Sequence, residues 1–147
     1  MTSTQMRHIL ALWRNAGVPV RPGASAGQLA DFEAKYGVSL GDDVREYFGC
    51  VDGMDESDAD EHGIRFWPIG EASRVDEHLE VDDARLFNGY FVFADYILWS
   101  HAYAMKLDAE GIGGNVVVVG GNGPIVVARG FGEFLSVYIS DPRRVFP

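Results

Sequence analysis

The chain has 147 residues, of which 22 are acidic and 12 basic, giving a net charge of −10 at pH 7. Its 47% hydrophobic content is enough to bury a core, so we expect one folded domain over residues 1–147 and not a disordered chain. The acidic balance argues against binding to nucleic acid or to an anionic membrane surface, because both require cationic side chains.

Three helices are predicted in the first third of the chain. Apolar residues at helical spacing indicate a helix near Thr4–Asn15. Ser25 and Gln28 form a capping box that begins a second helix, which Gly37 ends. A third helix begins near Asp42, where carboxylates suit the positive end of the helix dipole. The expected buried faces comprise Met6, Ile9, Leu10 and Trp13, then Leu29, Phe32 and Tyr36, then Val44, Tyr47, Phe48 and Val51.

After residue 63 the pattern becomes strand-like. Residues 64–68 predict a brief strand closed by proline, and residues 71–84 predict only a short helix or irregular loop. Residues 90–107 are rich in β-formers but too long for one strand, so we expect them to bend into two. Residues 115–119 and 125–128 form a hairpin across a glycine-rich turn. A last helix closes over the sheet through Phe131, Phe134, Leu135, Tyr138 and Ile139.

Two features favour a cytoplasmic location. Cys50 is the only cysteine, so no disulfide can form within the chain, as is usual in a reducing compartment. The apolar run at residues 9–13 is shorter than the core of a secretory signal, and no stretch approaches the ~20 apolar residues of a membrane helix.

The negative charge is concentrated in one part of the sequence. Residues 52–83 hold twelve acids and two bases, whereas the remainder of the chain is balanced. The densest stretch, residues 52–62, has six carboxylates and neither lysine nor arginine. This stretch is either a solvated loop or an acidic face that steers a basic protein partner, and a face of this kind raises the association rate and selectivity more than affinity.

The partner-binding candidates come from this stretch and from the residue that follows it. Trp67 stands beside Pro68 just after the acids, and we expect it to be partly exposed, as interface hot spots are. Trp99 is expected to pack in the core. The acidic candidates are Asp55, Glu56, Asp58, Asp60 and Glu61.

No metal or cofactor site is predicted. Asp58, Asp60 and Gly63 match the first, third and sixth positions of a calcium-binding EF-hand loop, but Ile69 occupies the twelfth position, where a bidentate glutamate is required. The four histidines occur at no metal-ligand spacing.

The search for catalytic residues predicts a non-enzymatic protein. Ser100 and His101 are neighbours in a strand, so their side chains point to opposite faces and cannot pair. His101 is expected to lie among aromatic residues, and Asp95 to cap a turn or to anchor the chain beyond it by a hydrogen bond. An enzyme or small-ligand binder would need a deep pocket lined by Asp95, His101 and Tyr103.

Four blocks of sequence, in the same order, resemble the SMI1/KNR4 (SUKH) superfamily over about residues 25–140. Two positions depart from the pattern of that superfamily. Gly41 stands where proline is usual, and Gly130 is a weak N-cap for the last helix. The blocks are Leu29–Leu40 with Asp42–Phe48 and Asp52-Gly53, Phe66–Glu71, Phe93–Asp108, and Val126–Tyr138.

The resemblance implies an α+β fold with a mixed, mostly antiparallel sheet flanked by N-terminal helices and a C-terminal helix. It implies no catalysis. Bacterial members are mostly immunity proteins that bind toxins, often nucleases, and ten arginines among the twelve basic residues fit a GC-rich bacterial gene. We therefore expect an immunity protein that neutralises a basic toxin domain. The alternative is an intracellular scaffold or regulatory protein without a toxin partner.

Overall fold

The computed structural model describes residues 3–78, 84–120 and 123–146. Three helices come first, as predicted: α1 (Thr4–Asn15), α2 (Ala26–Tyr36) and α3 (Asp42–Cys50). The predicted capping box at the start of α2 is confirmed, with Ser25 and Gln28 each accepting a backbone N–H of the other, and Gly37 ends the helix with a positive φ of 66°.

The strands form one antiparallel sheet in the order β1-β3-β4-β5-β6. The short strand β2 also pairs with β3, next to β1. Residues 90–107 bend into β3 and β4 as predicted. Residues 71–84, expected to form a short helix or an irregular loop, contain β2 and a short 3-10 helix, η1 (Val75–Glu77). Residues 79–83 lie outside the described residues, as do residues 121–122 of the glycine turn. The strands are β1 (Ile64–Phe66), β2 (Ser73–Arg74), β3 (Tyr90–Tyr96), β4 (His101–Lys106), β5 (Val116–Gly120) and β6 (Gly123–Ala128).

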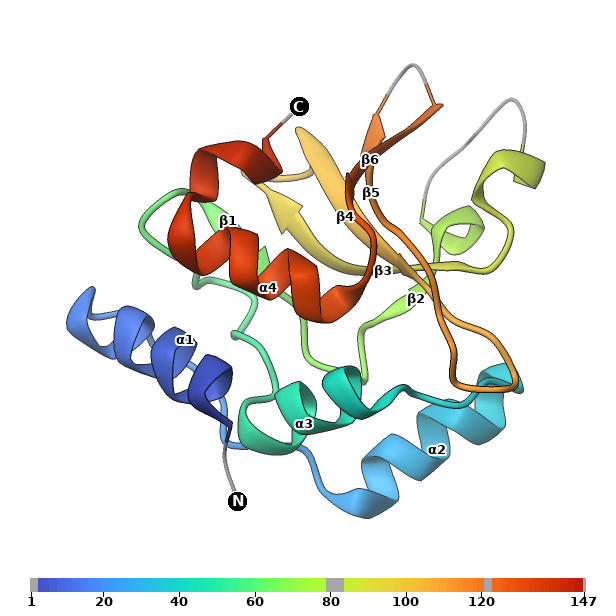
Figure 1. Ribbon diagram of the computed structural model, residues 1–147, viewed down its shortest axis with the longest axis horizontal. Coiled ribbons are helices and arrows are strands. Elements are labelled where there is room, and N and C mark those ends of the chain that lie inside the picture. The colour runs from blue at the N-terminus through green and yellow to red at the C-terminus, as the bar shows by residue number, and fades with distance from the viewer. Residues whose placement is uncertain (1–2, 79–83, 121–122, 147) are drawn as a thin grey trace.

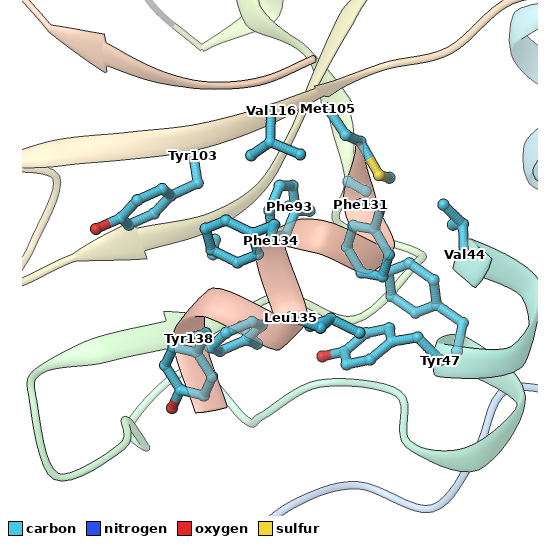
Figure 2. Packing of buried hydrophobic residues seen from close by; sticks show 14 of the residues in the cluster. Val44, Tyr47, Phe93, Tyr103, Met105, Val116, Phe131, Phe134, Leu135 and Tyr138 are labelled. Carbon is cyan, nitrogen blue, oxygen red and sulfur yellow. The ribbon is translucent and has the colours of Figure 1, made fainter. Parts of the chain in front are cut away.

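The predicted C-terminal helix, α4 (Phe131–Ser140), packs against one face of the sheet (Figure 1). Its apolar residues lie between the sheet and α3, so that Phe131 contacts the ring of Phe93 on one side and that of Tyr47 on the other (Figure 2). All four α-helices contribute to this main core, and the prediction of an α+β fold is confirmed.

The opposite face of the sheet carries a second, smaller core. It is covered by η1 (Val75–Glu77) and η2 (Ala84–Phe87) instead of α-helices. Its buried members are Trp67, Val75, Phe87, Val92, Ala102, Ala104, Val117 and Val119.

A β-bulge in β3 decides which face several residues occupy. The pairing with β4 shifts between Val92 and Ala94, so Phe93 and Ala94 both belong to the main core. The alternation beyond the bulge is therefore reversed, and Asp95 pairs with Ala102 on the side of the smaller core. Without the bulge, Asp95 would share the helix-covered face with Phe93.

Two buried tyrosines in the main core differ in how their hydroxyl groups are satisfied. The Tyr138 hydroxyl accepts a hydrogen bond from Trp13 Nε1 at 2.8 Å and donates one to Asp60 Oδ2. The Tyr47 hydroxyl is buried without a hydrogen-bond partner in the described part of the chain. Burial raises the pKa of both phenols, so both stay protonated at neutral pH.

Replacing Tyr47 with phenylalanine should raise the free energy of unfolding by about 1 kcal/mol, because it removes a buried hydroxyl that makes no hydrogen bond. Urea denaturation measures this change. The matched substitution Tyr138→Phe should lower the free energy of unfolding, because it leaves Trp13 Nε1 without its acceptor. If the two substitutions changed the free energy of unfolding equally, the two hydroxyl groups would not differ in their hydrogen bonding as described.

Candidate partner-binding site

Two arginines fix the backbone of the acidic stretch 52–62 to the body of the protein. Arg65 donates from Nε to the carbonyl oxygen of Asp55 and from Nη2 to that of Met54, both at 2.9 Å. Arg21 donates from Nη1 to Asp55 Oδ1 at 2.9 Å. The stretch is therefore tied to the body of the protein at Met54 and Asp55.

Asp52 and Asp60 point inward, which sequence reasoning did not predict. Asp52 is buried and accepts a hydrogen bond from the backbone N–H of Ile69 at 2.7 Å. Asp60 is 7% exposed, and its Oδ1 accepts the N–H groups of His62 and Ile64 at 2.8 and 2.9 Å. With Oδ2 bonded to Tyr138, Asp60 joins the acidic stretch to α4, so the expectation that it faces a partner is wrong.

The other four acidic candidates remain available to solvent. Asp55, Glu56 and Glu61 are exposed and Asp58 is half-buried. The Asp55 carboxylate is paired with Arg21, and Glu61 lies 3.6 Å from His62 Nε2. Of the four, Glu56 and Asp58 line a concave surface, which makes them the acids best placed to contact a partner side chain.

This surface is a groove of about 680 Å³ between the acidic stretch and the β3–β4 turn. Its charged lining residues are Glu56, Asp58, Glu71, Asp95 and Arg65. Arg65 is engaged by Glu71 through two hydrogen bonds of 3.1 and 2.9 Å, so its charge is already compensated. The apolar and aromatic lining residues include Trp67, His78, Ile97, Leu98 and Trp99.

The roles expected of Trp67 and Trp99 are reversed in the structure. Trp67 is only 4% exposed, packs in the smaller core and donates from Nε1 to Asp95 Oδ1 at 2.7 Å. Trp99, expected in the core, is 37% exposed at the edge of the groove. The bend between β3 and β4 explains the error, because Trp99 lies in the turn and does not continue a strand face.

The β3–β4 turn itself is made of large apolar residues. Ile97, Leu98 and Trp99 all have positive φ values, of 32°, 48° and 68°, a conformation that costs non-glycine residues roughly 1–2 kcal/mol each. Asp95 Oδ2 supports the turn by accepting the N–H of Trp99 at 3.2 Å, so the predicted role of Asp95 as a turn cap is confirmed. Leu98 is 93% exposed and Ile97 is also exposed.

The three aromatic rings of the groove form a compact group. The ring centroids of Trp67 and Trp99 are 5.1 Å apart, and His78 lies 5.2 Å from Trp67 and 5.4 Å from Trp99. Trp99 and His78 were not recognised as site residues from the sequence. A signal existed for Trp99, since a bend predicted within residues 90–107 places apolar residues in a turn, where they cannot all be buried.

Asp95, His101 and Tyr103 do not line a common pocket. Asp95 faces the groove, whereas Tyr103 is buried in the main core. His101 stacks on Tyr96 with ring centroids 4.8 Å apart and lies 3.0 Å from the Tyr103 hydroxyl through Nε2. This confirms the expectation that His101 lies among aromatic residues. Desolvation lowers the pKa of His101, although the nearby Asp95 opposes the shift.

Among residues 3–78, 84–120 and 123–146, no cluster of three or more His, Cys, Asp or Glu is arranged to hold a metal ion. Over the same residues, no helix is long and apolar enough to cross a membrane.

Comparison with known proteins identifies the family. A search of curated proteins gave no significant match. The model of the SMI1 / KNR4 family (SUKH-1) matches residues 23–137, which include α2, α3, every strand of the sheet and most of α4. Because this match covers well over half of the sequence, the chain belongs to the SMI1/KNR4 (SUKH-1) family.

Proposed function

We propose that this protein is a non-catalytic binding module of the cytoplasm that neutralises a basic toxin domain, of the nuclease type, by direct contact. The observation that carries the proposal is the position of the charge. The net charge of −10 arises from residues 52–83, and three acids of this segment, Glu56, Asp58 and Glu71, line the groove that the apolar β3–β4 turn also lines.

The chemistry of a nuclease supports this choice of partner. A nuclease presents a cationic groove to its nucleic acid substrate, so an acidic surface next to exposed apolar residues is complementary to it in charge and offers area for contact. Family membership adds support, because the bacterial members that the sequence resembles are mostly immunity proteins. The burial of Tyr103 speaks against the one enzyme alternative considered, which required Asp95, His101 and Tyr103 to line a deep pocket.

Co-expression with the product of the adjacent upstream gene tests the proposal. If that product contains a toxic C-terminal domain, this protein should restore growth and co-purify with that domain in a stable complex. A toxin that still kills in the presence of the folded protein, or a neighbouring gene without a toxin domain, would count against the immunity role and favour the scaffold alternative.

A further inference from the structure

The groove differs from a purely apolar docking surface because carboxylates without an ion-pair partner among the described residues line it. Asp95 is 8% exposed, and its two oxygens accept hydrogen bonds from the neutral N–H groups of Trp67 and Trp99. These bonds orient the carboxylate without neutralising it. Glu56 and Asp58 add two further carboxylates on the side of the acidic stretch.

Arg65 is the one cation among the described residues that line the groove. It stands opposite Asp95 in the β1–β3 register, but its ion pair is with Glu71 and not with Asp95, Glu56 or Asp58. Its guanidinium group donates to both oxygens of Glu71 and to the carbonyl oxygens of Met54 and Asp55. Asp95, Glu56 and Asp58 therefore remain as a negative set in a surface partly shielded from water, where an added cation is attracted more strongly than on an open surface.

The aromatic side of the groove suits the same kind of ligand. The exposed part of Trp99 adjoins Trp67 and His78, and tryptophan is the side chain whose ring face attracts cations best. A guanidinium group is planar, stacks on aromatic rings and donates hydrogen bonds to carboxylates at its edge. The exposed aliphatic side chains of Ile97 and Leu98 supply contact for the methylene stem of such a residue or for its neighbours.

The geometry points to a specific occupant: the groove between Trp99 and the carboxylates of Glu56, Asp58 and Asp95 binds an arginine side chain presented by a basic segment of a protein partner. This inference rests on the proposed binding function and deepens it, since it names the recognition element. Trp99 stacks on the guanidinium plane, and the carboxylates accept its N–H groups.

Two blocked pentapeptides, Gly-Arg-Gly-Arg-Gly and its uncharged citrulline analogue, test the inference by NMR on the nitrogen-15-labelled chain. The arginine peptide should shift the indole N–H signals of Trp67 and Trp99 saturably. Trp13 is an internal control, because its indole is bonded to Tyr138 in the main core and should not respond. The citrulline peptide should cause no saturable shift. Equal binding of both peptides, or shifts that spare Trp67 and Trp99, would overturn the inference.

Variants of the groove sharpen the test. Trp99→Asn removes the ring while asparagine tolerates the positive φ at this position, and it should weaken binding of the arginine peptide about tenfold. The double variant Glu56→Gln, Asp58→Asn should also weaken binding. Its matched control, Asp31→Asn with Glu110→Gln, removes two exposed acids outside the groove and should leave binding unchanged. If both double variants weakened binding equally, the peptide would be attracted by the overall net charge and not by the groove. The assignment of the groove as the binding site would then be rejected.

The peptide-binding and growth-rescue experiments together separate this inference from the proposed function. If the arginine peptide binds at the groove but the neighbouring gene product does not bind, the immunity role fails and the groove assignment stands. If growth rescue is complete with the folded Trp99→Asn variant and the peptide fails to bind the unaltered protein, the immunity role stands and the groove assignment fails.

Discussion

Replacing Asp60 with alanine should lower the free energy of unfolding by about 3 kcal/mol, an effect large enough to threaten the folded state of a small domain. The carboxylate accepts three hydrogen bonds, from the backbone N–H groups of His62 and Ile64 and from the Tyr138 hydroxyl. Its removal leaves buried donors without acceptors, and each such donor costs about 1–3 kcal/mol. Urea or thermal denaturation measures the loss.

The same substitution two residues earlier is the control. Asp58 is half-buried, and we expect Asp58→Ala to change the free energy of unfolding by less than about 0.5 kcal/mol, as is usual for surface substitutions. If Asp58→Ala and Asp60→Ala were equally mild, Asp60 would not have the structural role assigned to it. The comparison therefore tests whether the acids of one stretch divide into a structural and a solvent-facing set.

The solvent-facing acids should control the rate at which a basic partner associates. Converting Glu56, Asp58 and Glu61 to their amides should slow association with the basic toxin domain that we propose as the partner about tenfold at low ionic strength, because long-range attraction raises the encounter rate. Stopped-flow mixing at several salt concentrations measures both the rate and its salt dependence, which should become flatter in the variant. Asp60 is left unchanged so that the fold is preserved.

A second triple variant shows whether the position of the charge matters or only its amount. Asp31, Asp42 and Glu110 are exposed acids outside the 52–83 segment, and their conversion to amides removes the same three charges. We expect this control to slow association much less than the variant of the acidic stretch. Equal slowing by the two variants would show that overall net charge, and not the acidic face, attracts the partner.

Local sequence was sufficient to predict the helices. The first helix was predicted at residues 4–15 and is observed there, because four apolar residues at helical spacing identify its buried face without knowledge of its neighbours. The capping box of Ser25 and Gln28 was equally predictable, since both of its hydrogen bonds join residues three positions apart. The bend within residues 90–107 followed from a length limit on strands.

The candidate binding surface was only partly predictable from the sequence. Charge counting found the acidic stretch, but it could not distinguish Asp60, whose partners include Tyr138, 78 residues away, from the exposed Glu61 beside it. The two tryptophans were likewise exchanged between core and surface. Asp60 and Trp67 are buried by segments distant in the sequence, since Trp67 donates to Asp95, 28 residues away. Trp99 is exposed because it lies in the β3–β4 turn.

Short-range patterns thus determined the helices, the number of main strands and the concentration of charge, because capping, periodicity and composition depend on residues close together in the chain. Tertiary packing alone decided which polar and aromatic side chains face outward. One bulge in β3 moves Asp95 from the helix-covered face to the face of Trp67, and the turn after it brings Trp99 to the acidic stretch. Successive residues of a strand point to opposite faces of the sheet, so a shift of one residue moves each side chain beyond it from one core to the other.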